Sequence, residues 1–263
     1  MKQLHFYKYQ GTGNDFVMID NRLAHFSKDD VELIRFLCDR KFGIGGDGLI
    51  LLENDSTADF KMVYYNADGN ESTMCGNGGR CIVAFAKDLG IIQEKTTFNA
   101  VDGLHNAHFT ADANVALQMI DVPKKSILLK NETLFLFTGS PHHIEMVNNL
   151  QQFDVYNKGK EVRYCETYKP GGTNVNFVEQ ISEDAFKIRT YERGVEDETL
   201  ACGTGATAAA IAMHSLGKTT FNLIKIGVEG GDLEVHFNYN DDAYTDVMLI
   251  GPAKKVFNGE IYI

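Results

Sequence analysis

Two stretches of this sequence repeat one pattern, and the repeat limits what the chain can fold into. In each copy a tyrosine, Tyr64 or Tyr191, lies eleven residues before a Cys-Gly-x-Gly segment, and the run of small residues that follows ends at Leu-Gly. The two cysteines, Cys75 and Cys202, are more than a hundred residues apart. Because a solenoid needs several short units, two long copies predict two domains of similar structure.

Short alternating strand patterns, with about two helices in each half, indicate an α+β fold. Helices are expected over residues 27–40, with a capping box from Ser27 and Asp30, and over residues 151–164. The predicted domains are 1–116 and 117–255, and the strand-like tail 256–263 is expected to return to the first domain. Strand patterns are found at residues 4–10, 48–53, 60–65, 116–122, 133–139, 186–191 and 233–237.

Composition favours a small-molecule partner over a polymer or a membrane. The formal net charge is −11 and no run of Lys or Arg could neutralise several phosphates, so we expect no nucleic-acid binding. No segment approaches the ~18 apolar residues of a membrane span, and the N-terminus does not resemble a signal peptide. We therefore expect a cytoplasmic protein. Five cysteines without paired Cys-x-x-Cys spacing predict neither a metal site nor a disulfide framework.

The glycine-rich segment 43–48 matches the spacing of a dinucleotide-binding loop but has the wrong context. That fingerprint requires a strand before it and a helix after it, whereas here a predicted helix precedes and a strand pattern follows. We interpret these glycines as the end of a helix and a tight turn.

Each Cys-Gly-x-Gly segment stands directly before a helix of small residues. The free N–H groups and positive dipole end of a helix stabilise a thiolate and can hold a carboxylate. A lone cysteine is more often a small buried hydrophobe, and Cys38, Cys81 and Cys165 are interpreted in that way. Two cysteines at equivalent positions of a duplication favour chemistry instead.

Proton exchange at one carbon from opposite faces needs this kind of pair. One thiolate removes a proton from one face while the other thiol delivers a proton to the opposite face. If a pseudo-twofold axis relates the halves, both helix starts would face one cleft between the domains, with the active site there. Charge on the substrate carboxylate would be stabilised by the backbone N–H groups of the residues after each cysteine, Gly76, Asn77, Gly203 and Thr204.

At these motifs the sequence resembles the diaminopimelate epimerase family. The matching segments, in the order of the family, are GTGNDFVMID, GIGGDGLILLE, YNADGNESTMCGNGGRC, GSPH, NVNF and YERGVEDETLACGTGA. The resemblance covers nearly the whole chain. It implies two pseudo-symmetric domains, each with strands curled around a central helix. It also implies a homodimer that interconverts LL- and meso-diaminopimelate without metal or pyridoxal phosphate.

The resemblance also assigns residues. It implies that Asn14, Asn66, Asn174 and Arg193 bind the distal end of the substrate, and that Glu192 and His142 pair with the two cysteines. Alternatively, the first two asparagines are turn residues, His142 belongs to a solvated loop and Glu192-Arg193 is a surface ion pair. Two positions depart from the family pattern: Ser140 replaces an asparagine that would contact the distal carboxylate, and Gly48 stands where some members have glutamine.

Two other functions remain open. Proline racemases and hydroxyproline epimerases use a cysteine pair on the same fold, but their first cysteine is typically followed by Gly-His, whereas Asn77 follows Cys75-Gly76 here. A non-catalytic binding protein for a diamino acid would use the same cleft.

Overall fold

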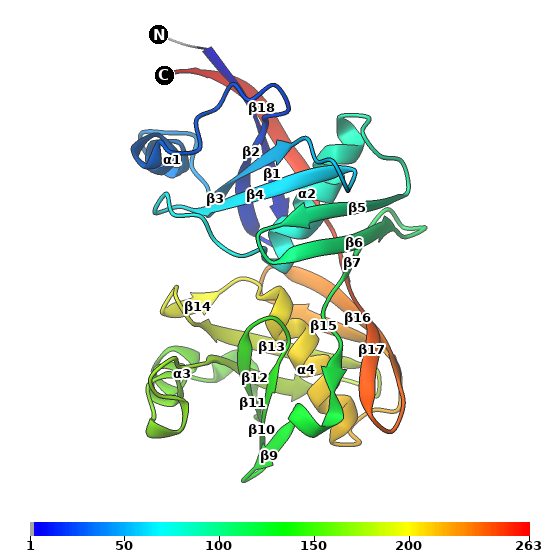
Figure 1. The fold of residues 1–263 in the computed structure, drawn as a ribbon. Coiled ribbons are helices and arrows are strands. Elements are labelled where there is room, and N and C mark those ends of the chain that lie inside the picture. The colour runs from blue at the N-terminus through cyan, green and yellow to red at the C-terminus, as the bar shows by residue number, and fades with distance from the viewer. Residues whose placement is uncertain (1–2) are drawn as a thin grey trace. The chain divides into compact units, whose positions relative to one another are not determined.

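The computed structural model describes residues 3–263, which form two compact units. The first unit runs to Leu117 and also takes in Gly251–Ile263, and the second is Gln118–Ile250 (Figure 1). The boundary predicted from the sequence lies near residue 116. No helix among the described residues is long and apolar enough to span a membrane.

The first unit is a mixed sheet in which neighbouring strands follow the order β18, β1, β2, β3, β4, β5, β6, β7. Only the pairs β2–β3 and β4–β5 are parallel. The C-terminal strand lies beside the N-terminal one, so the tail returns to this unit. The bounds are β1 Gln3–Gly11, β2 Asn14–Asp20, β3 Gly48–Glu53, β4 Phe60–Asn66, β5 Lys95–Ala100, β6 Gly103–Phe109, β7 Val115–Gln118 and β18 Lys254–Tyr262.

The second unit repeats this topology. Its strands follow the order β10, β11, β12, β13, β15, β16, β17, and the parallel pairs, β11–β12 and β13–β15, come at the same places as in the first unit. Three short strands, β8, β9 and β14, are added to this plan. The bounds are β8 Val122–Pro123, β9 Leu128–Lys130, β10 Thr133–Phe137, β11 Pro141–Met146, β12 Asn174–Gln180, β13 Ala185–Glu192, β14 Asp197–Thr199, β15 Leu223–Val228, β16 Gly231–Tyr239 and β17 Ala243–Gly251. The duplication in sequence is therefore a duplication of fold.

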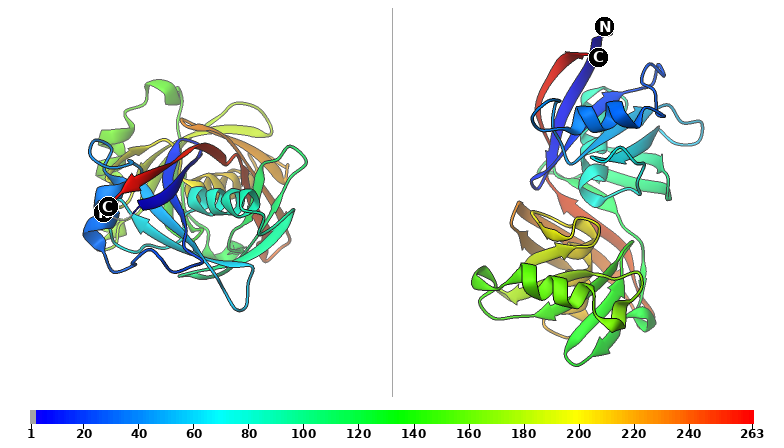
Figure 2. Two further views of the ribbon diagram at one scale, coloured as in Figure 1. Left: turned by 90° about the horizontal axis from the view of Figure 1, so that it is seen from above. Right: turned by 90° about the vertical axis from the view of Figure 1, so that its left-hand side faces the viewer.

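In each unit the strands curl around one central helix (Figures 1 and 2). Helix α2, Gly76–Asp88, contacts β1, β2, β3 and β18, and helix α4, Gly203–Ser215, contacts β10 to β13, β15 and β16. Small side chains let the sheet approach closely, since the alanines of α4 at 206, 208, 209, 210 and 212 are fully buried. The predicted α+β fold is confirmed.

The outer face of each sheet is covered by a shorter helix, α1, Val31–Cys38, or α3, Val155–Arg163. Alternate residues of the strands therefore point to two buried layers. On β3, Leu49 and Leu51 pack with α1, while Ile50 points toward α2. On β12, Val175 and Phe177 pack in the cluster that contains Val155 of α3. Asn176, which lies between Val175 and Phe177, therefore faces α4.

The boundaries of three predicted elements were wrong. Helix α1 begins later than expected, because Asp30 rather than Ser27 is its N-cap and accepts a hydrogen bond from the Leu33 N–H at 3.0 Å. Residues 151–164 divide into a 3₁₀ turn, Leu150–Gln152, and α3, because Asp154 caps the latter. The strand expected over 116–122 is interrupted between β7 and β8. The glycines of 43–48 do not cap the helix, because α1 ends at Cys38 and Asp39 is its C-cap, but the expected turn is present and Gly45 has a φ of +84°.

Replacing Asp30 should show that it caps α1. Asp30→Ala removes the acceptor of the Leu33 N–H and should lower the free energy of unfolding by about 1 kcal/mol, as measured by urea denaturation. Ser27→Ala is the matched control and should change it by less than about 0.5 kcal/mol, because Ser27 is exposed and precedes the cap. A larger loss in Ser27→Ala than in Asp30→Ala would support the capping box expected from sequence.

Candidate active site

Both repeat cysteines stand at helix starts, as predicted. Cys75 is the N-cap of α2, and its Sγ accepts a hydrogen bond from the Gly78 N–H at 3.2 Å. Cys202 is the N-cap of α4, and its Sγ lies 3.5 Å from Oγ1 of Thr204. Each cysteine therefore stands at the first turn of a helix, whose N–H groups have no partner within the helix and stabilise negative charge.

The second glycine of each Cys-Gly-x-Gly leaves room for the thiol. A Cβ on Gly78 would lie 3.2 Å from Sγ of Cys75 and 3.1 Å from the side chain of Ile50. A Cβ on Gly205 would lie 3.3 Å from Sγ of Cys202 and would overlap Oδ1 of Asn176. The motif therefore fixes where each sulfur sits against its sheet.

The side chain of Arg80 is hydrogen-bonded to the first residues of helix α2 from inside the protein. Its side chain is fully buried and donates to the carbonyl of Gly76 at 3.2 Å and to Oγ1 of Thr12 and Oδ1 of Asn77 at 3.1 Å. Burial lowers the pKa of Arg80 to about 10, which leaves it cationic at neutral pH. The acceptors named here are neutral, so this positive charge acts on the region of Cys75. Arg80 was not among the site residues predicted from the sequence, although a charged residue within a run of small and apolar residues is a visible signal.

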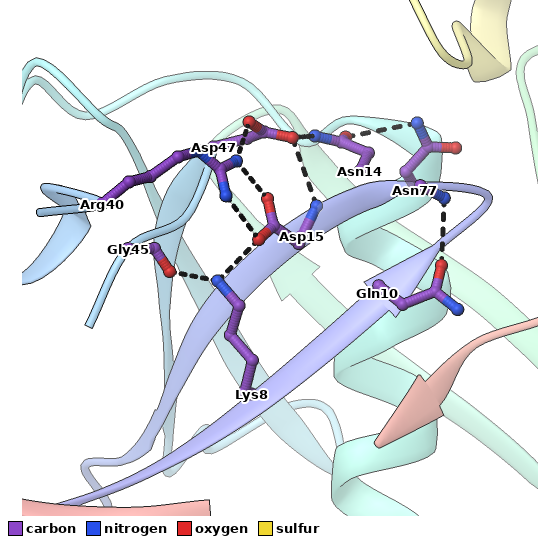
Figure 3. Close-up of polar contacts among 9 residues, drawn as sticks. Lys8, Gln10, Asn14, Asp15, Arg40, Gly45, Asp47 and Asn77 are labelled. Atoms are coloured by element: carbon purple, nitrogen blue, oxygen red, sulfur yellow. Dashed lines mark hydrogen bonds and ion pairs between the residues drawn. The ribbon is translucent and has the colours of Figure 1, made fainter. Parts of the chain in front are cut away.

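Asn14 is held by a polar network at the start of β2 (Figure 3). Its amide nitrogen donates to Asp47 at 2.5 Å, and its oxygen accepts from Asn77 at 3.2 Å. Arg40 contacts Asp47 at 2.7 Å and Asp15 at 2.6 Å, which holds the pKa of Asp15 down to about 2 despite its burial. The structure thus brings Asn14 and Asn77 together next to Cys75, and ion pairs fix the orientation of the Asn14 amide.

Asn66 lies exposed at the end of β4, opposite Gly48 on β3, and Gly48 in turn pairs with Phe16 on β2. A Cβ on Gly48 would lie 2.6 Å from the ring of Tyr64 and would overlap the carbonyl oxygen of Tyr65. A glutamine at this position, which the resemblance implied for some members of the family, therefore does not fit this backbone without rearrangement.

In the second unit, Ser140 joins two of the predicted binding residues. Its Oγ accepts from the amide of Asn174 at 2.9 Å and lies 3.4 Å from a guanidinium nitrogen of Arg193. The side-chain oxygen of Asn174 accepts from the backbone N–H of Arg193 at 2.8 Å. Glu192, at the end of β13, accepts from the hydroxyl of Thr199 at 2.7 Å. Ser140, Asn174 and Arg193 thus form one connected group.

His142 is fully buried on β11 and is not a solvated loop residue. Its Nε2 lies 2.9 Å from Oγ1 of Thr204, and its Nδ1 lies 3.1 Å from the amide nitrogen of Asn176. Burial, together with the charge of Arg193, lowers the pKa of His142 to about 3. The imidazole is therefore neutral at physiological pH. It is linked to Cys202 indirectly, because Oγ1 of Thr204 lies close to both side chains.

The remaining cysteines have other environments. Cys38 and Cys81 are buried, and burial raises the pKa of each thiol to about 12, which agrees with a packing role. Cys165 is only partly buried, so the expectation that it is a core residue was wrong. Among residues 3–263, no group of three or more His, Cys, Asp or Glu is arranged to hold a metal ion.

The fold is shared with proteins of very different sequence. A Bacillus anthracis phenazine biosynthesis protein of the PhzF family superposes with a TM-score of 0.75 at 15% identity, covering 100% of both chains. A hydroxyproline epimerase from Agrobacterium vitis superposes with a TM-score of 0.70 at 14% identity, covering 98% of this chain and 92% of that one. These likenesses establish the class of fold, two curled units of one topology.

Sequence comparison gives the family within that fold. The model of the diaminopimelate epimerase family matches residues 6–124 and 135–256. A Flavobacterium psychrophilum protein named diaminopimelate epimerase is 60% identical over 97% of this chain and 99% of its own length. A protein of the same name from Chlorobaculum tepidum is 47% identical over 95% of this chain and 98% of its own length. The chain belongs to the diaminopimelate epimerase family.

The ring of His142 should not titrate near neutrality. The pKa of His142 in the folded chain, about 3, lies below its ordinary value of 6.5. Between these two pH values the unfolded chain therefore binds a proton at His142 that the folded chain does not bind. This residue therefore makes the fold less stable as the pH falls from 6.5 toward 3. Histidine NMR should show one ring, identified by its absence in His142→Gln, with no titration between about pH 5 and 8. A midpoint near 6.5 would contradict the buried neutral assignment.

Proposed function

We propose that this chain is a diaminopimelate epimerase, which interconverts LL- and meso-diaminopimelate with two cysteine thiols and without metal or organic cofactor. The observation that carries the proposal is the pair of cysteines, Cys75 and Cys202, at equivalent helix starts of a duplicated fold. Its family membership and a relative of that name at 60% identity support the substrate. The product would serve as a precursor for lysine and peptidoglycan.

The chemistry follows from two thiols in opposite protonation states. A thiolate takes the α-proton, the electron pair of the broken C–H bond remains on the carbon beside the carboxylate, and the thiol on the other face supplies a proton. The reverse reaction exchanges the two roles. Backbone N–H groups of Gly76, Asn77, Gly203 and Thr204, in the first turns of α2 and α4, would stabilise the charge that develops on the carboxylate.

The distal amino and carboxyl groups would bind to the polar side chains that the family resemblance assigns to them. These are Asn14, Asn66, Asn174, Arg193 and Glu192, of which Glu192 would bind the distal amine. The departure at Ser140 has a simple account: its oxygen accepts from Asn174 and faces Arg193, so its own hydrogen is available for a carboxylate. A hydroxyl can thus replace the amide donor of the family pattern.

Replacing either cysteine tests the mechanism. With LL-diaminopimelate in heavy water, the unaltered enzyme under reducing conditions should place deuterium at one α-carbon while forming the meso isomer. Cys75→Ala and Cys202→Ala should each lower this turnover by at least about 100-fold, because each removes one acid–base group. Cys165→Ala is the matched control and should retain full turnover. Unchanged turnover in both variants would contradict the two-thiol mechanism.

Two alternatives differ in measurable ways. An epimerase of another amino acid would turn over proline or hydroxyproline at least as fast as diaminopimelate when these are compared side by side. A non-catalytic binding protein would bind LL-diaminopimelate without any exchange of the α-proton. We expect diaminopimelate to be preferred, because Glu192 and Arg193 suit a substrate with a second amino and carboxyl group.

We also propose that the protein is a cytoplasmic homodimer. The mechanism needs both thiols reduced, a condition that the cytoplasm provides. Strand β18 exposes three large apolar side chains, Val256, Phe257 and Tyr262, with exposed fractions of 55%, 46% and 63%, and these could be covered in a dimer. Sedimentation should give twice the chain mass, and a monomer at micromolar concentration would contradict the dimer.

A further inference from the structure

Asn176 of β12 makes contacts that the proposed mechanism does not use. It lies two residues after Asn174, so both side chains emerge on the face of β12 opposite Val175 and Phe177. Its amide nitrogen lies 3.0 Å from the carbonyl oxygen of His143 and 3.1 Å from Nδ1 of His142. Its oxygen accepts from the hydroxyl of Thr190 at 2.9 Å. All of these groups are buried.

These contacts determine which ring nitrogen of His142 carries the proton. A carbonyl oxygen can only accept, so the Asn176 atom that faces His143 must be the NH₂ group. The same NH₂ donates to Nδ1 of His142, which therefore carries no hydrogen. In a neutral ring the proton is then on Nε2, and that N–H donates to Oγ1 of Thr204 at 2.9 Å.

The direction of the Thr204 hydroxyl follows in turn. Its oxygen accepts from His142, so its single hydrogen is available for the sulfur of Cys202, 3.5 Å away. Thr138 helps to hold Thr204 in place, because its hydroxyl donates to the Thr204 carbonyl at 2.8 Å. A donor aimed at a sulfur favours its thiolate form.

The first unit shows that the fold does not require this arrangement. In the matching parallel strand pairs, His142 lies opposite Asn174, and Phe16 lies opposite Gly48. Two residues farther along, Asn176 approaches Gly205, and Ile50 approaches the equivalent Gly78. Phe16 and Ile50 are fully buried and apolar. The same sheet and helix are thus built without the polar chain, which points to a role in chemistry for Asn176.

We propose that Asn176 is a positioning residue that fixes His142 as the Nε2–H tautomer and thereby directs the Thr204 hydroxyl to stabilise the thiolate of Cys202. This inference deepens the proposed function and rests on it for its catalytic meaning. Arg193 is the charged group whose field reaches His142. His143, the neighbouring histidine, faces away toward Tyr168 and Glu145.

Two substitutions of nearly unchanged shape test the chain of contacts. Asn176→Asp replaces the donor to Nδ1 by an acceptor, so the ring should switch to the Nδ1–H tautomer and Nε2 should accept the Thr204 hydrogen. Thr204→Val removes the hydroxyl but keeps the shape. In both proteins the pH midpoint for thiolate formation at Cys202 should rise by about one unit, a 10-fold loss of thiolate at a given pH below it.

The midpoint is read from thiolate absorbance near 240 nm, as the difference from the same protein carrying Cys202→Ala. Thr204→Ser keeps the hydroxyl and should show the same midpoint as the unaltered protein. Thr207→Val is the matched control, because Thr207 is a buried threonine of the same helix whose hydroxyl donates to the carbonyl of Gly203. It should leave the midpoint unchanged. The ¹⁵N shifts of His142 should report protonated Nε2 in the unaltered protein and protonated Nδ1 in Asn176→Asp.

Three results would overturn the proposal: protonated Nδ1 in the unaltered protein, an unchanged midpoint in Thr204→Val, or a shift in Asn176→Asp without a change of tautomer. None of these measurements requires turnover. If the unaltered protein fails to epimerise diaminopimelate but shows the expected midpoints and tautomers, the proposed function fails while the positioning role of Asn176 stands.

Discussion

The position of each proposed catalytic thiol depends on one constraint, a cysteine side chain at the N-cap of a buried helix. At this position the side chain starts beside backbone N–H groups that have no partner within the helix. The glycine three residues later keeps the space around it open. Because the helix is enclosed by its own sheet, strand residues line each helix start, as Ile50 of β3 does at Gly78 and Asn176 of β12 does at Gly205. Sheet register therefore sets the chemistry of each site.

The duplication supplies two such sites, but their surroundings differ. Cys75 accepts from a backbone N–H and lies in the field of the buried guanidinium of Arg80. Cys202 faces the Thr204 hydroxyl, which is linked to the neutral ring of His142. At the position of Arg80 the second helix has Thr207. An epimerase must accept two stereoisomers, and a pair of thiols with separate means of stabilisation allows each to be tuned without the other.

The sequence predicted features that depend on local pattern. The duplication, the helix starts at both cysteines and the turn at Gly45 are each marked by spacing or by glycine, and the structure contains them. It did not predict Asp30 as the cap of α1, because Ser27 offers an equally good local signal and only packing decides between them. Arg80 and Asn176 were missed because their partners, such as Pro252 and His142, are distant in sequence. The period of two in Asn-Val-Asn-Phe was the available signal for Asn176.

The central claim, that one base acts on each face of the α-carbon, is tested most directly by following the label at low conversion in heavy water. Starting separately from LL- and from meso-diaminopimelate, the account predicts deuterium in nearly all of the first product, while the recovered substrate keeps its original proton. Each thiol exchanges with solvent only on its own face before the next turnover. Equal labelling of recovered substrate and product from both directions would indicate a single base and would contradict the account.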